Sequence, residues 1–196
     1  MMTTELTQQV TREHTVRRKA TLEEFWALPE SMLPTEYING EIIMAPAPTA
    51  GHQIVVGNIH FALREFLQKV AIGTVFISPL DVVLPTGEVV QPDAFVITDD
   101  ESLPAASDKN VRAAPSLAVE ILSPGSIKHD TITKRNLYEQ NGVREYWIVD
   151  PDAKTIAQLV LEGEHYVLTE LTENDIIRSA ALAGFEMVVR ELLGLS

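Results

Sequence analysis

Two carboxylates interrupt apolar segments that otherwise read as buried strands. Asp93 ends the turn 91–93, directly before the apolar run 94–97, and Glu120 lies inside the apolar run 117–122. A carboxylate in such a place is costly to bury unless something binds it. Two carboxylates on neighbouring strands are able to hold a hard divalent cation, which prefers oxygen ligands. The alternatives are that Asp93 is an ordinary turn residue and that Glu120 is a buried, paired glutamate.

Two further residues have the character of site residues. Asp81 also lies inside an apolar run, 80–84, and a third carboxylate would complete an oxygen shell for Mg²⁺ or Mn²⁺. Its alternative is an edge-strand residue that faces water. His52 lies near the start of a predicted helix, one turn before its apolar stripe, and is therefore expected to face the sheet. It is either a structural histidine or a catalytic or metal-adjacent one.

A lysine follows Glu120 on a predicted helix. Asp130, Lys134 and Tyr138 are four residues apart and share one face of an α-helix. One interpretation is a solvated face with an ion pair. The other is that Lys134 points back toward Glu120 and places an ammonium group near a developing oxyanion. The spacing leaves both open.

The elements that must position these residues alternate between helical and strand patterns. A helix over 50–70 carries an apolar stripe at helical spacing, and a second helix is predicted from about 127 to 141. A capping box at Thr21 and Glu24 predicts a short helix to about residue 28. Strands are predicted over 74–78, 80–84, 89–90, 94–98, 117–122 and 145–149, and hairpins over 37–44 and 154–168. Segment 185–193 is a strand or a helix. This order predicts an α/β or α+β fold with a mixed sheet.

Length and composition restrict the class of protein. A chain of 196 residues with 45% apolar residues predicts one globular domain, 21–196, after a polar tail, 1–20. No apolar run is long enough to span a membrane. There is no cysteine, and a cytoplasmic location is the simplest expectation. The net charge of −13 argues against a protein that coats nucleic acid, although a metal cluster and a local basic patch can act against the overall field.

Several stretches, taken in order, resemble the Uma-type endonucleases of the PD-(D/E)XK restriction-endonuclease-like superfamily. They are 37–41, 51–52, 91–93, 119–124, the set Asp130, Lys134 and Tyr138, and 142–151. The resemblance covers about residues 21–193. It implies a central mixed sheet flanked by helices with extra hairpins, and a Mg²⁺ (or Mn²⁺) site at Asp93 and Glu120.

The resemblance also concerns the catalytic lysine. The superfamily usually carries a lysine two residues after the glutamate, and here that position is Leu122. Uma-type sequences place the lysine on the following helix, which matches Lys134. His52 and Asp81 match family positions as well. Asp93, Glu120, Lys134 and His52 are therefore the expected catalytic residues, and Asp81 is an expected further metal ligand.

The expected function is metal-dependent hydrolysis of phosphodiester bonds in DNA. A double-stranded substrate makes a homodimer plausible, because cutting both strands usually needs two sites. No membrane partner is expected. The alternative is a catalytically inactive nucleic-acid- or protein-binding module that retains the fold, favoured by Leu122 and by the acidic surface. A third class is a metal-dependent hydrolase that acts on another substrate.

Overall fold

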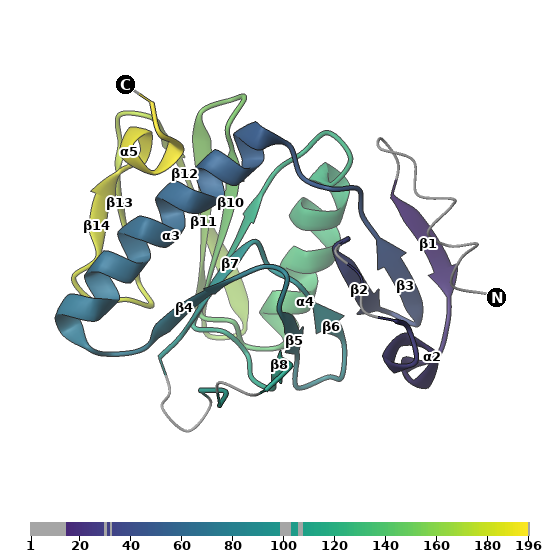
Figure 1. The fold of residues 1–196 in the computed structure, drawn as a ribbon. Helices are drawn as coiled ribbons and strands as arrows, with labels where there is room; N and C mark the ends of the chain where they lie inside the picture. The colour runs from purple at the N-terminus through teal and green to yellow at the C-terminus, as the bar shows by residue number, and fades with distance from the viewer. Residues whose placement is uncertain (1–14, 30, 32, 99–102, 106–107, 196) are drawn as a thin grey trace.

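The computed structural model describes residues 15–195, apart from 30, 32, 99–102 and 106–107 (Figure 1). Its centre is a six-stranded mixed sheet, here called the central sheet, with the order β12-β11-β10-β9-β7-β4. The strands are β4 (Thr74–Ile77), β7 (Ala94–Ile97), β9 (Leu117–Ile121), β10 (Glu145–Asp150), β11 (Thr155–Glu162) and β12 (His165–Thr172). Strands β9 and β10 are parallel, and their other neighbours in this sheet pair antiparallel.

A second six-stranded sheet, here called the N-terminal sheet, has the order β1-β3-β2-β6-β5-β8. Its strands are β1 (Val16–Lys19), β2 (Thr35–Ile38), β3 (Glu41–Met44), β5 (Asp81–Val83), β6 (Val89–Val90) and β8 (Asn110–Val111). The turn between β2 and β3 contains Asn39 and Gly40, both with positive φ, which matches the twist of a two-residue hairpin. A small hairpin of β13 (Ile176–Arg178) and β14 (Glu186–Val188) forms a separate two-stranded sheet.

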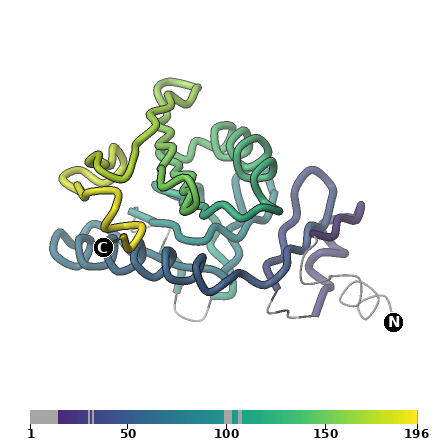
Figure 2. The backbone as a smooth tube through the Cα atoms, turned by 90° about the horizontal axis from the view of Figure 1, so that it is seen from above, coloured from purple at the N-terminus to yellow at the C-terminus, as the bar shows by residue number. Residues whose placement is uncertain are grey.

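Helices cover both faces of the central sheet (Figure 2). Helix α3 (Ala50–Val70) begins at Thr49, whose side chain accepts a hydrogen bond from the His52 backbone. Its buried stripe packs with α5 (Val189–Leu193) against one face. On the other face lie η2 (His129–Lys134) and α4 (Arg135–Gln140), which run on from each other. Helix α2 (Leu22–Trp26) packs on the N-terminal sheet.

The alternation along β9 decides which way Glu120 points. Leu117, Val119 and Ile121 belong to the core under α3, whereas Ala118 belongs to the core under α4. Successive strand residues point to opposite faces, so Glu120 points toward η2 and α4. This second core contains residues of both large sheets and of α4, which places the helix between the sheets.

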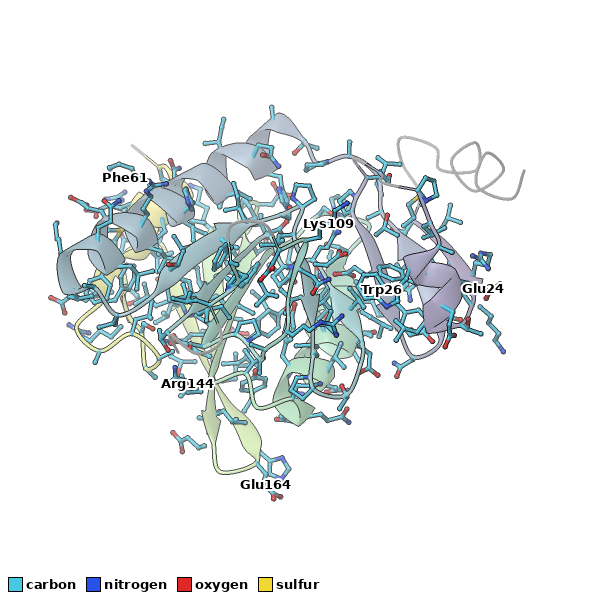
Figure 3. The ribbon with its side chains drawn as sticks, turned by 60° about the horizontal axis from the view of Figure 1, so that its bottom comes forward. Glu24, Trp26, Phe61, Lys109, Arg144 and Glu164 are labelled. Carbon is cyan, nitrogen blue, oxygen red and sulfur yellow. The ribbon has the colours of Figure 1, made fainter. Side chains whose placement is uncertain are left out.

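Most of the predicted elements are confirmed. The mixed sheet, the capping box at Thr21, the hairpin at Asn39–Gly40 and the helix over 50–70 are all present. The hairpin of β11 and β12 projects from the molecule with Glu164 at its tip (Figure 3). Among the described residues, no helix combines the length and apolar character that crossing a membrane requires.

Three expectations need correction. Residues 16–19 were expected in the tail but form β1, because the edge of β3 offers a full antiparallel register to them; residues 1–14 lie outside the described part. Segment 185–193 contains both a strand and a helix, β14 and α5. The short strands β8 and β13 were not predicted, since two or three residues carry too little alternation to be recognised.

Candidate active site

Glu120 is buried against the helix that follows it in the chain. The Lys134 ammonium lies 2.7 Å from Oε1 of Glu120, and the Tyr138 hydroxyl donates to the same oxygen at 3.0 Å. All three side chains are almost fully buried. The predicted approach of Lys134 to Glu120 is therefore present, and the alternative of a solvated helix face is wrong.

A second carboxylate, Glu36 of β2, shares Lys134. Its Oε1 lies 2.8 Å from the lysine Nζ and accepts the backbone N–H of Gln91 at 2.9 Å. Its Oε2 lies 2.8 Å from Nε2 of His129. Glu36 is 6% exposed, so Lys134 is held between two buried carboxylates that come from different sheets.

The element η2 is a π-helix, and this explains how two of its residues reach the same carboxylate. His129 and Lys134 are five residues apart, and in an α-helix such residues point in clearly different directions. A π-helix has i→i+5 hydrogen bonds and brings residues five apart onto one side. Both side chains therefore contact Glu36.

Asp93 lies beside Glu120 across the β7–β9 pair. Ala94 pairs with Val119, and continuing this antiparallel register by one residue places Asp93 next to Glu120. Its Oδ2 accepts the Ile121 backbone N–H at 2.8 Å and lies 3.0 Å from Nε2 of His52. The predicted direction of His52 toward the sheet is confirmed, and its partner is Asp93.

The charges around Glu120 oppose its ionisation. Burial raises its pKa well above the usual range, the Lys134 charge acts in the opposite direction, and Asp130, Asp93 and Glu36 add to the increase. Burial disfavours the Lys134 ammonium, but Glu120 and Glu36 outweigh this and hold the lysine pKa well above its ordinary value. Lys134 is therefore a fixed positive charge at neutral pH.

Glu36 behaves in the opposite way to Glu120. Burial raises its pKa, but Lys134, His129 and the Gln91 amide together lower it to about 2. Two positive or donating groups act on Glu36 in addition to the shared lysine, whereas Glu120 has Tyr138 and several anions around it. Glu36 is thus the better counter-ion of Lys134, and Glu120 is the carboxylate that lacks compensating charge.

His52 carries a raised pKa. Burial alone would lower it, but the hydrogen bond and the charge of Asp93 outweigh burial. The other ring nitrogen, Nδ1, is buried and has no hydrogen-bond partner among the described residues. An unpaired buried polar atom is unusual, and it marks the side of the His52 ring away from Asp93 as a place where a further polar group would be satisfied.

Asp81 lies at the margin of this group. Its Oδ1 accepts a hydrogen bond from the Gln91 side chain at 2.7 Å. Burial raises its pKa, the Gln91 hydrogen bond lowers it, and the charge of Glu36 raises it further. Gln91 also accepts the Thr35 backbone N–H, so it ties Asp81 to β2. As placed, Asp81 contacts Gln91 rather than Asp93 or Glu120.

The donor set fits a magnesium-like ion with few protein ligands. Within the described part of the chain, no three His, Cys, Asp or Glu side chains are arranged to hold a metal ion. Mg²⁺ typically uses one or two carboxylates and keeps waters and substrate phosphates as its other ligands. Asp93 and Glu120 are adjacent and provide two such carboxylates. The excess negative charge that raises the pKa of Glu120 is what a divalent cation would offset.

Comparison with known proteins decides the family. The profile of the Uma2 family, described as "Putative restriction endonuclease", matches residues 22–190. The chain belongs to the Uma2 family. A crystal structure from Anabaena variabilis, described as that of a "putative nuclease belonging to DUF820", is 21% identical in sequence and superposes with a TM-score of 0.76, covering 89% of this chain and 97% of that one. No curated protein matches the chain.

These matches confirm the resemblance to the Uma-type family and the expected fold. At 21% identity, the structural similarity shows the fold alone. The central mixed sheet flanked by helices is therefore the restriction-endonuclease-like fold that the resemblance implied.

Sequence reasoning missed two residues of the polar group around Lys134, Glu36 and His129. Glu36 lies in β2, but the strand was expected to begin at Tyr37 and this excluded it. His129 was missed because α-helical spacing puts it on a different face from Lys134. The signal for Glu36 was present: an acid immediately before the apolar pair that leads into the Asn39–Gly40 turn.

Another buried carboxylate, Glu145, shows how the fold satisfies an acid with hydrogen bonds from neutral groups. It is 0% exposed. Its Oε1 accepts from Trp147 Nε1 at 2.6 Å and Gln158 Nε2 at 2.7 Å, and its Oε2 accepts from Ser179 Oγ at 2.6 Å and the Ala181 amide at 2.8 Å. Four neutral donors thus satisfy both oxygens. The comparison emphasises that Asp93 and Glu120 are not satisfied in this way.

Proposed function

We propose that this Uma2 chain is a metal-dependent endonuclease that hydrolyses phosphodiester bonds in DNA. The observation that carries the proposal is the placement of Lys134 against Glu120, with Asp93 bonded to the backbone of the next residue, Ile121. Two carboxylates and an ammonium group at one place provide the charges that phosphodiester hydrolysis requires. Family membership supports nuclease chemistry in general.

Asp93 and Glu120 are the proposed ligands of a Mg²⁺ or Mn²⁺ ion. When bound, such an ion activates water and offsets the negative charge of the phosphodiester. Asp81 stays a predicted further ligand, and Gln91 holds its carboxylate at the margin of the site. His52 orients Asp93 through the 3.0 Å contact with Oδ2, so that its own role is positioning.

Lys134 is the proposed electrostatic catalyst. A lysine has three N–H donors, and Glu36 and Glu120 use two of them. We assign the third to a phosphate oxygen. Because the surrounding carboxylates raise the pKa of Lys134, it remains charged and stabilises negative charge rather than removing a proton. This assignment gives the helix lysine the function that Leu122 is unable to supply.

Cleavage assays with paired variants test the proposal. Wild-type protein should cut plasmid DNA when Mg²⁺ or Mn²⁺ is added, and Asp93→Asn and Glu120→Gln should lose this activity while remaining folded by circular dichroism. Asp152→Asn, in an exposed turn, is the matched control and should cut normally. Full activity in both site variants would overturn the assignment. Plasmid, single-stranded DNA, RNA and small phosphodiesters compared side by side define the substrate class, including the proposed preference for double-stranded DNA.

A second candidate is a binding module that retains the nuclease fold without catalysis. Leu122 at the usual lysine position and the net charge of −13 favour it. Titration calorimetry separates the two, since a catalytic pair should bind Mg²⁺ or Mn²⁺ and an inactive one should not. Sedimentation of the wild-type protein with and without DNA tests the proposed homodimer.

A further inference from the structure

A chain of polar contacts joins the N-terminal strand β1 to Lys134. Arg17 Nη2 lies 3.2 Å from Nδ1 of His129, and Nε2 of the same ring lies 2.8 Å from Oε2 of Glu36. Glu36 Oε1 then lies 2.8 Å from Lys134 Nζ. Arg17 also lies 3.9 Å from Glu41 of β3. A residue far outside the carboxylate pair is therefore connected to the proposed catalytic lysine by two intermediates.

The Arg17 contact determines the tautomer of His129. A guanidinium group has donors and no acceptor, so Nδ1 of His129 must accept and carries no proton. The ring proton then lies on Nε2 and is donated to Glu36. The charged groups that face this ring are Arg17 from β1, Glu36 from β2 and, on its own turn, Asp130 and Lys134.

Both oxygens of Glu36 are occupied by protein donors. Oε2 accepts from His129, and Oε1 accepts from Lys134 and from the Gln91 amide. A carboxylate engaged in this way is unsuited to bind a metal ion as well. Its geometric effect is to hold the Lys134 ammonium at a fixed point, 2.7 Å from Glu120.

We propose that Glu36 is a positioning residue, and that Arg17 and His129 fix its carboxylate so that Lys134 stays against Glu120. This rests on the proposed function in one respect, namely that Lys134 acts on the substrate. The strand β1 is then part of the catalytic apparatus, although it lies at the edge of the other sheet. Outer-shell partners of this kind typically change activity by about 10- to 100-fold when removed.

Two isosteric variants of His129 give the sharpest test. The amide nitrogen of glutamine lies where Nε2 of histidine lies, so His129→Gln should still donate to Glu36. The asparagine amide corresponds to Nδ1 and does not reach Glu36. We expect His129→Gln, which keeps the donor to Glu36 but loses the acceptor for Arg17, to lose no more kcat than Arg17→Ala, and His129→Asn to lose kcat by about 10- to 100-fold with little change in KM. Equal activity of both variants with wild type, or equal loss in both, would overturn the proposal.

The role of Arg17 is tested by a double-mutant cycle. Arg17→Ala should lower kcat in the wild-type background and have no further effect in the His129→Asn background, because the contact is already lost. Lys19→Ala is the matched control, since it removes one positive charge from the same face of β1 and should act alike in both backgrounds. Additive effects of Arg17→Ala and His129→Asn would overturn the proposed connection.

A measurement that needs no activity keeps this inference separate from the proposed function. In metal-free protein, ¹⁵N NMR should show His129 protonated on Nε2, and the buried Lys134 ammonium should give a signal protected from exchange in wild type and His129→Gln but not in His129→Asn. If wild type cuts no substrate, the proposed function falls and these spectra still decide the inference. A proton on Nδ1 of His129, or an equally protected Lys134 signal in His129→Asn, would overturn it.

Discussion

Glu36 and Glu120 contact the same ammonium group and respond to it in opposite ways. Lys134 lies 2.8 Å from one carboxylate and 2.7 Å from the other. The difference comes from the remaining neighbours, because His129 and an amide assist Glu36 while three carboxylates oppose Glu120. One carboxylate therefore stabilises the fold, and the other is left with unbalanced charge that a cation can use.

Glu36 should make stability depend on pH in the acid range. Its pKa is lowered from 4.5 to about 2 in the folded protein, so its contribution is present above about pH 4.5 and is lost as pH falls through about 2. Glu36→Gln should lower the free energy of unfolding on the order of 3 kcal/mol at pH 7. Urea unfolding from pH 7 to pH 3 should show the difference from wild type shrinking as pH falls. A constant difference across this range would contradict the assignment.

Removal of Lys134 should destabilise the protein far more than removal of a surface lysine. Lys134→Met leaves Glu36 and Glu120 buried without their counter-ion, which typically costs about 3–5 kcal/mol. Lys69→Met is the control, because its i,i+4 pair with Glu65 is exposed and such pairs contribute less than about 1 kcal/mol. Urea unfolding at pH 7 measures both. Similar losses in the two variants would show that Lys134 is not the buried counter-ion.

At the scale of elements, the helix after β9 shows what sequence spacing is able to predict. The spacing correctly placed Lys134 and Tyr138 on one face, since the segment from Arg135 is α-helical, and the structure shows that this face contacts Glu120. The same rule failed for His129, because the π-helix η2 brings it onto the same side as Lys134 although the two are five residues apart. Apolar periodicity does not reveal an extra residue in a turn, so the helix was predictable and the second partner of Glu36 was not.

Inserting one residue into the π-helix η2 should separate the two groups that hold Glu36. With an alanine added after Ile132, which is 51% exposed, His129 and Lys134 are six residues apart, and neither an α-helix nor a π-helix brings such residues onto one side. We expect cleavage to fall by about 10- to 100-fold. Ile132→Ala keeps the length of the helix and should cut as wild type. Normal activity of the insertion variant would mean that the alignment of His129 with Lys134 is not needed.

At the scale of the whole molecule, the site lies where two sheets meet. Glu120 belongs to the central sheet, Glu36 to the N-terminal sheet, and Lys134 to the helix between them. The family resemblance and the apolar runs predicted the Asp93, Glu120 and Lys134 group. They did not predict Glu36, which is 93 residues from His129 along the chain, because a contact between a strand and a distant helix leaves no periodic pattern in either element.

Divalent cations should stabilise the folded protein in a concentration-dependent way. A ligand that binds the native state adds about 2.7 kcal/mol at a hundredfold excess over its Kd, and the acidic site should favour Mg²⁺ or Mn²⁺. Thermal unfolding of wild type should therefore shift upward as Mg²⁺ is added, and Asp93→Asn should shift much less. K⁺ at matched ionic strength controls for screening of the net charge of −13. Identical shifts in wild type and Asp93→Asn would place the ion elsewhere.

Glu145 is a second kind of buried acid in this fold, and it provides a reference for the variants of Glu36 and Glu120. Glu145 is enclosed by four neutral donors, and none of them belongs to the polar group around Glu120. Its replacement by glutamine therefore measures the effect on stability alone. The loss in the free energy of unfolding of a Glu36 or Glu120 variant can be compared with that of Glu145→Gln. Changes around Glu145 should therefore lower stability without touching the proposed site, whereas changes around Lys134 should alter both stability and the proposed activity.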